Sequence, residues 1–225
     1  MIAVAIDGPA GAGKSTIART VAKKMGLLYV DTGALYRTVG LYMIRRGIPP
    51  DDACRVREAV QDGGMEIRLA FQNGEQRVLL CGEDVTQEIR TPEVSIASSQ
   101  VSAVPEVRRF LFSLQRDLAK EHSVIMDGRD IGTVVLPWAQ VKIFLTASPE
   151  ERANRRWKEL QEKGEAADYA QVLSDIQRRD EKDSTRAIAP LTPAPDAETV
   201  DTSRLTLEEA AQIVESRIRA ALPQE

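Results

Sequence analysis

Short apolar runs rich in valine, isoleucine and leucine recur along the chain, and longer segments with helical periodicity separate them. The clearest runs lie at residues 2–6, 28–30, 124–126 and 141–145, and a shorter extended segment lies at 199–201. Continuous apolar runs of this length are typical of parallel strands that are buried on both faces. The alternation of such strands with helices predicts an α/β fold.

Three of the helices have recognisable ends. Residues 14–25 carry apolar side chains on one face, and Gly26 follows as a C-cap. Ser148 opens the sequence SPEE, and Thr206 opens TLEE. Both have the form of a capping box, so helices are predicted to begin directly after each of them.

Two segments depart from the α/β rhythm. Residues 65–85 alternate between apolar and polar positions around a turn at 72–74, which predicts a small antiparallel insert. Residues 190–195 contain three prolines and predict a rigid, exposed connection.

Composition narrows the classes of function. Hydrophobic residues make up 43% of the 225 positions and charged residues 28%, which excludes a disordered or fibrous chain. The net charge of −4 argues against non-specific binding of nucleic acid.

No apolar stretch is long enough to span a bilayer. Cys54 and Cys81 form no metal-binding or disulfide pattern. We expect a cytoplasmic protein with no membrane or nucleic-acid partner. A monomer is expected, because no heptad repeat or adhesive strand edge is visible.

The strongest motif lies between the first strand and the first helix. Residues 8–15 read GPAGAGKS and match the phosphate-binding pattern GxxxxGK[ST] in the required context. The glycines allow backbone N–H groups to converge on phosphate oxygens, Lys14 neutralises the β- and γ-phosphates, and the Ser15 hydroxyl is a ligand for Mg²⁺. ATP is therefore the expected donor, with Mg²⁺ as cofactor. The residues expected to bind it are Gly8, Pro9, Ala10, Gly11, Ala12, Gly13, Lys14, Ser15 and Thr16.

Nucleotide binding alone is compatible with a switch, a motor or a kinase. A guanine-reading NKxD motif is missing from the sequence. Phosphoryl transfer to a small acceptor requires a second anion-binding site that faces the first. Residues 31–37 (DTGALYR) and 124–130 (VIMDGRD) supply arginines directly after two strands, at the sheet edge where α/β proteins bind ligands.

At these two segments the chain resembles the bacterial cytidylate kinase family, a branch of the nucleoside monophosphate kinases. Other matching segments, spread over essentially the whole chain, are 82–85 (GEDV), 88–91 (EIRT), 97–101 (ASSQV), 178–180 (RRD) and 186–191 (RAIAPL). The resemblance implies one P-loop kinase domain in three layers with about five parallel strands. Its implied parts are core 1–60, a monophosphate-binding insert 61–105, core 106–147, a helical lid 148–190 and C-terminal core 191–225.

The resemblance also implies a set of acceptor residues. Thr32 stands where family members often carry serine, and it keeps the hydroxyl. The residues implied to hold the acceptor nucleotide are Thr32, Arg37, Ser99, Arg108, Arg129, Asp130, Arg179, Asp183 and Arg186. Those expected to act on the transferring group are Lys14, Asp127, Arg129, Arg152 and Arg156.

The chemistry of these residue types agrees with transfer from ATP to CMP or dCMP. A nucleoside monophosphate is largely dianionic near neutral pH, because its second pKa is about 6, so charge repulsion is the main obstacle. Arginines neutralise that charge bidentately. Asp130 can accept a hydrogen bond from the cytosine amine while Arg186 donates to the ring, whereas uracil would face Asp130 with an oxygen.

Simpler interpretations remain for several of these residues. Arg152 and Arg156 are also compatible with a solvated helix face, Arg129 and Asp130 with a structural ion pair, and Asp127 with a helix cap instead of a water-mediated Mg²⁺ contact. Two other functions also remain open. One is a P-loop kinase for UMP, AMP or shikimate, and the other is a non-catalytic ATP-binding sensor.

Overall fold

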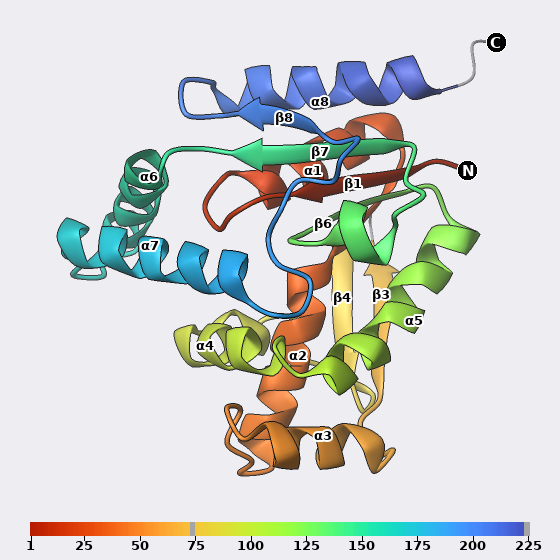
Figure 1. Ribbon diagram of the computed structural model, residues 1–225, viewed down its shortest axis with the longest axis vertical. Coiled ribbons are helices and arrows are strands. Elements are labelled where there is room, and N and C mark those ends of the chain that lie inside the picture. The colour runs from red at the N-terminus through yellow and green to blue at the C-terminus, as the bar shows by residue number, and fades with distance from the viewer. Residues whose placement is uncertain (73–74, 223–225) are drawn as a thin grey trace. The chain divides into compact units, whose positions relative to one another are not determined.

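The computed structural model describes residues 1–72 and 75–222, and the chain divides into two compact units. The first unit comprises Met1–Leu27 together with the chain described from Ser123 onward, and the second is Leu28–His122. Each is described separately below (Figure 1).

The parallel sheet has five strands in the order β2-β6-β1-β7-β8. Their bounds are β1 Ala3–Asp7, β2 Leu28–Asp31, β6 Val124–Gly128, β7 Val141–Thr146 and β8 Glu198–Asp201. In the first unit β1 is the central strand, pairing in parallel with β6 on one side and with β7 on the other. All five residues of β1 are buried, as expected for a strand covered on both faces. The predicted α/β fold is confirmed.

The helices of the first unit are α1 (Lys14–Met25), α6 (Pro149–Glu162), α7 (Tyr169–Thr185) and α8 (Leu207–Ala221). A short π-helix, η2, covers Ile131–Val135. Helix α1 has the predicted bounds, and Gly26 ends it in the left-handed conformation with φ of 68°. Strands β7 and β8 point toward the end of the sheet from which α6 departs (Figure 1).

The two predicted capping boxes differ in the structure. At Thr206 the box is complete, because side chain and backbone of Thr206 and Glu209 bond reciprocally. At Ser148 only half of it forms: the Ser148 hydroxyl accepts from the Glu151 N–H at 3.2 Å. The Ser148 N–H instead donates to the Ser203 hydroxyl at 2.9 Å, so the reciprocal half of the box does not form. A partner distant in sequence has taken the place of the local one. The predicted start of a helix is confirmed at both places, because α6 begins at Pro149 and α8 at Leu207.

The second unit combines helices with the predicted antiparallel sheet. Its helices are α2 (Thr32–Arg45), α3 (Ala53–Gln61), α4 (Pro92–Val101), α5 (Pro105–Glu121) and the 3₁₀ turn η1 (Glu88–Arg90). Strands β3 (Ile67–Gln72), β4 (Glu75–Leu80) and β5 (Glu83–Asp84) pair antiparallel in that order, which confirms the insert. The predicted turn at 72–74 includes residues 73–74, which lie outside the described residues.

The proline-rich connection at 190–195 is not simply exposed. Leu191 and Ala194 are 8% and 5% exposed, and the Leu191 N–H donates to the Asp183 carbonyl at 2.8 Å. The predicted exposure is confirmed for Thr192, Pro193 and Pro195, whereas the apolar residues between the prolines pack inward.

Within residues 1–72 and 75–222, no helix is long and apolar enough to cross a membrane. Cys54 and Cys81 are free, exposed thiols.

Candidate phosphate-transfer site

The glycine-rich loop of the first unit is closely packed against its neighbours. A Cβ atom on Gly8, whose φ is 145°, would lie 1.9 Å from the Leu145 carbonyl oxygen of β7. On Gly11, at φ of 79°, it would lie 3.1 Å from Cβ of Arg152. At Gly8 a side chain would displace the backbone of β7, and at Gly11 the positive φ together with the side chain of Arg152 disfavours any other residue. The loop is therefore held in the curved form that directs backbone N–H groups at an anion.

Lys14 lies at the start of α1 with its ammonium group inside the loop. It is 5% exposed, and its Nζ donates to the Pro9 carbonyl at 2.7 Å. Burial, followed by the nearby positive charge of Arg129, lowers the pKa of Lys14 well below its ordinary value. A buried cation in this setting is stabilised by any anion that enters the loop.

Ser15 and Asp127 form the second feature of the loop. The Ser15 hydroxyl donates to Asp127 Oδ2 at 2.7 Å, and Asp127 is 5% exposed at the end of β6. These are hard oxygen donors, which suit Mg²⁺. Among the residues that the structure describes, no cluster of three or more acidic, histidine or cysteine side chains is placed to hold a metal. A hydroxyl and a carboxylate fit Mg²⁺, which is usually bound through one or two carboxylates and completed by phosphate oxygens and water.

Asp7 is a buried carboxylate that the sequence-based site omitted. It ends β1, and its two oxygens accept from the N–H groups of Ile131 and Gly132, each at 2.7 Å. Burial raises the pKa of the Asp7 carboxyl to about 6. Asp7 therefore ties the strand before the phosphate loop to the first turn of η2. The available signal was an acid at the end of an otherwise apolar strand.

Two ion pairs join the segment after β6 to the end of α7 and the residues beyond it. Arg129 Nε donates to Asp183 Oδ2 at 3.0 Å, and Arg186 Nη2 lies 3.7 Å from Asp130 Oδ1. Arg186 Nε also donates to the Ala189 carbonyl at 2.5 Å. Both carboxylates are at most 9% exposed. Four of the predicted acceptor residues are therefore brought together in the first unit.

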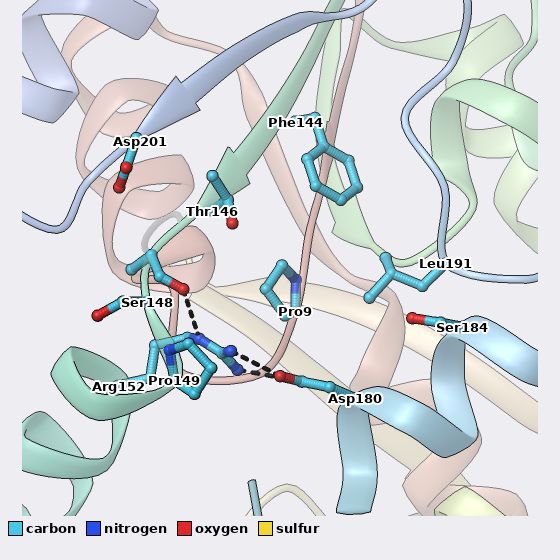
Figure 2. Close-up of a pocket in the computed structure, with 11 residues that line it drawn as sticks. Pro9, Phe144, Thr146, Ser148, Pro149, Arg152, Asp180, Ser184, Leu191 and Asp201 are labelled. Carbon is cyan, nitrogen blue, oxygen red and sulfur yellow. Dashed lines mark hydrogen bonds and ion pairs between the residues drawn. The ribbon is translucent and has the colours of Figure 1, made fainter. Parts of the chain in front are cut away.

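Arg152 connects three parts of the first unit, and Figure 2 shows its contact with Asp180. Its guanidinium binds both carboxylate oxygens of Asp180 on α7, at 3.0 and 2.6 Å. It also donates to the carbonyls of Ala147 and, in the phosphate loop, Ala10. Arg152 is 2% exposed, whereas Arg156 is exposed and pairs with Glu159 at 2.8 Å. Only the first of the two predicted lid arginines reaches the loop.

A cleft of about 440 Å³ opens beside the loop, at the carboxyl ends of β7 and β8. Its lining comprises Pro9, Phe144, Thr146, Ala147, Ser148, Pro149, Arg152, Asp180, Ser184, Leu191 and Asp201. This is the edge of an open α/β sheet where ligands bind.

In the second unit, the carboxylate of Asp31 at the end of β2 lies close to two arginines. Asp31 caps α2 by accepting from the Ala34 N–H at 2.9 Å through Oδ1. Its Oδ2 lies 2.9 Å from Arg90 Nη1 and 3.9 Å from Arg37 Nη1. A Cβ on Gly33 would come within 3.2 Å of Asp31 Oδ1 and 3.5 Å of Arg37 Nη1. A side chain at Gly33 would therefore crowd the Asp31 carboxylate and contact the Arg37 guanidinium.

The remaining predicted acceptor residues of this unit differ in exposure. Thr32 is 3% exposed at the start of α2. Arg108 is 2% exposed, lies over the rings of Tyr36 and Phe112, and donates to the Ser102 carbonyl at 3.3 Å. Ser99 is half-buried on α4. Arg90, with 43% of its side chain exposed, was not among the predicted site residues, although its segment was noted.

The first unit combines a buried strand, a glycine-rich loop, a buried lysine and a serine–aspartate pair. These features define a P-loop nucleotide-binding protein. The family model described as cytidylate kinase matches residues 4–220. A cytidylate kinase of Caldicellulosiruptor saccharolyticus is 52% identical over 213 residues, which cover 95% of this chain and 93% of the relative. One of Pelotomaculum thermopropionicum is 50% identical over 217 residues, covering 96% of each. The chain belongs to the cytidylate kinase family.

A solved structure of an uncharacterized protein from Eubacterium ventriosum shares the fold, with a TM-score of 0.51. The two sequences are 11% identical, and the match covers 98% of this chain and 99% of the other. This likeness concerns the fold alone.

Proposed function

We propose that the protein transfers the γ-phosphoryl group of MgATP to CMP or dCMP, giving ADP and CDP or dCDP. An oxygen of the acceptor phosphate forms the new bond to the γ-phosphorus as the bond to the β,γ-bridging oxygen breaks. The transfer is direct and in line, without a covalent enzyme intermediate. The observation that carries the proposal is the phosphate loop with its buried Lys14, found in a chain of the cytidylate kinase family.

The donor triphosphate is assigned to residues 8–16. Lys14 releases the Pro9 carbonyl and binds the β- and γ-phosphate oxygens, where its charge offsets the charge that develops on transfer. Ser15 and Asp127 would hold Mg²⁺, with the Ser15 hydroxyl as a ligand and Asp127 orienting that hydroxyl and acting on the ion through water. When bound, Mg²⁺ neutralises phosphate charge.

The acceptor is assigned to the arginines and to Asp130. Arg37 in the second unit and Arg129 and Arg179 in the first supply positive charge for the acceptor phosphate. Asp130 accepts from the cytosine amine and Arg186 donates to the ring, a role supported by the burial of Asp130, by the half-buried position of Arg186 and by the 3.7 Å between them. Thr32, Ser99, Arg108 and Asp183 complete the proposed set.

The division into a monophosphate-binding insert (61–105) and a lid (148–190) stays part of this proposal. We assign Arg152 and Arg156 to the lid, with Arg152 acting next to the phosphate loop. A monomer in the cytoplasm, acting in pyrimidine nucleotide metabolism, is proposed. The exposed free thiols of Cys54 and Cys81 are typical of a reducing compartment.

The test is a coupled assay of ADP release with ATP and a panel of CMP, dCMP, UMP and AMP. CMP or dCMP should have the highest kcat/KM. The preference for CMP over UMP should fall in Asp130→Asn, because an asparagine amide can either donate or accept. Equal kcat/KM for CMP and UMP in the unaltered protein would remove the assignment of Asp130, and no turnover of any acceptor would favour the sensor.

The metal assignment has its own test. Asp127→Asn should raise the Mg²⁺ concentration needed for half-maximal activity by about 10- to 100-fold, because the neutral amide removes the negative charge that favours the cation and is a weaker acceptor for the Ser15 hydroxyl. A Mg²⁺ titration at saturating nucleotide measures this. An unchanged titration curve would assign Asp127 to capping alone.

A further inference from the structure

Gln76 forms two hydrogen bonds to one residue that lies far from it in sequence. Its Oε1 accepts from the Asp31 N–H at 2.8 Å, and its Nε2 donates to the Asp31 carbonyl at 3.3 Å. A backbone N–H can only donate and a carbonyl can only accept, so the amide has a single orientation that satisfies both. The side chain of Gln76 thus pairs with the end of β2 as a neighbouring strand would.

The position of Gln76 on β4 explains why it reaches Asp31. Side chains two apart on a strand share a face, and Val78 and Leu80 on the face of Gln76 are 1% and 3% exposed. Gln76 is therefore the polar end of a core-facing row. Its partner on β3 is Phe71, so the register of the antiparallel insert determines where the amide lies.

Arg37 and Arg90 form the arginine cluster of the second unit, and both lie against Asp31. Its side chain caps α2 and holds Arg90 at 2.9 Å, with Arg37 at 3.9 Å. The carboxylate is carried by the same peptide segment that Gln76 binds. Movement of this segment would displace the cap and both guanidinium groups together.

We infer that Gln76 is a positioning residue for the acceptor nucleotide, through which the antiparallel insert fixes Asp31 and hence Arg37. The inference rests on the proposed function, in which Arg37 binds the acceptor phosphate. Gln76 acts through its two hydrogen bonds to Asp31. Arg37 and Arg90 carry two positive charges and Asp31 one negative charge, so a net positive charge is left for the dianionic acceptor phosphate. The neutral amide of Gln76 holds these groups in place without changing that charge.

The experiment compares Gln76→Ala with Gln76→Met and with Gln72→Ala as a matched control. Methionine keeps the length of the side chain and removes both hydrogen bonds. Gln72 is an exposed glutamine on β3 of the same sheet, outside the proposed site. Both Gln76 variants should raise the KM for CMP about fivefold, the effect of losing one or two hydrogen bonds of ordinary strength. The KM for ATP should change less than about twofold. Gln72→Ala should change neither.

A merely structural role predicts a different result, in which the activity of both Gln76 variants falls in proportion to their folded fraction while the KM for CMP stays constant. That outcome would overturn the inference. If Gln76→Ala does not fold, Gln76→Met decides between the two outcomes, and an unfolded Gln76→Met would assign the amide to stability and overturn the inference as well.

Amide hydrogen exchange separates this inference from the proposed function. The Asp31 N–H should exchange faster in Gln76→Met than in the unaltered protein, because its acceptor is gone. If the Asp31 N–H exchanges faster in Gln76→Met but the unaltered protein does not turn over CMP, the proposed function is wrong and the Gln76–Asp31 contact is confirmed. Unchanged exchange together with an unchanged KM in an enzyme that phosphorylates CMP would overturn the positioning role alone.

Discussion

The phosphate loop of the first unit and the arginine cluster of the second unit hold positive charge in opposite ways. Lys14 is 5% exposed and bound to a backbone carbonyl a few residues away. Arg90 and Arg37 keep 43% and 25% of their side chains exposed and face the carboxylate of Asp31. The loop is one continuous segment, whereas the cluster joins the segments around residues 31, 76 and 90.

The difference has an energetic consequence. The buried ammonium of Lys14 donates to a neutral carbonyl, and the charges of Asp127 and Asp7 near it are opposed by Arg129 and Arg179, so an entering phosphate gains strongly from it. Arg90, which is exposed, and Arg37, which is half-buried, already face a carboxylate and have less to gain. Water partly screens these pairs, and the phosphate must compete with Asp31. The loop is thus a site for tight charge neutralisation, and the cluster is a site in which geometry matters more than burial.

Lys14→Ala tests the buried side of this comparison and should have the largest effect. Loss of the only ammonium in the loop should reduce kcat/KM by about a thousandfold, or about 4 kcal/mol of transition-state stabilisation. Steady-state assays with CMP measure it, and thermal unfolding reports whether the variant is folded. Lys23→Ala, an exposed lysine on α1, is the control and should keep full activity. Undiminished turnover in Lys14→Ala would contradict the mechanism.

The pH dependence of stability tests another buried charge of the first unit, the carboxylate of Asp7 directly before the phosphate loop. Its folded pKa is raised from 3.8 to about 6 by burial, so the folded protein binds this proton more tightly than the unfolded chain does. The contribution of Asp7 to the free energy of unfolding is therefore complete below about pH 4 and is lost as the pH rises through about 6. The loss is about 3 kcal/mol.

Urea unfolding at a series of pH values measures the effect. In Asp7→Asn this part of the slope between about pH 4 and 6 should vanish, because the amide does not titrate. An identical slope in the variant and the unaltered protein would show that another group is responsible.

Arg90→Ala tests the exposed side and should have the smallest effect on stability. The pair with Asp31 is partly screened by water, so its loss should lower the free energy of unfolding by less than about 1 kcal/mol. The difference should shrink further in concentrated salt. Denaturant unfolding at low and high ionic strength measures both quantities. A larger, salt-independent loss would mean that the cluster behaves like the buried loop.

Local signals allowed most of the fold and the phosphate loop to be predicted. The strands, the bounds of α1 and the GxxxxGK[ST] loop each depend on residues that are neighbours in sequence. The contacts that complete the sites join distant residues: Arg152 with Asp180, Asp7 with Gly132, and Gln76 with Asp31. Periodicity carries no information on such partners. The same reason explains Ser148, whose N–H bonds to Ser203 where the local pattern predicted Glu151.

The guanidinium of Arg152 has a mechanical consequence. One rigid, planar group is bonded at the same time to the peptide oxygen of Ala10, to that of Ala147 and to the carboxylate of Asp180. Any swing of α7 must therefore either rupture the link at Asp180 or pull on the backbone at Ala10. The orientation of α7 and the backbone conformation of the phosphate loop are therefore coupled through Arg152.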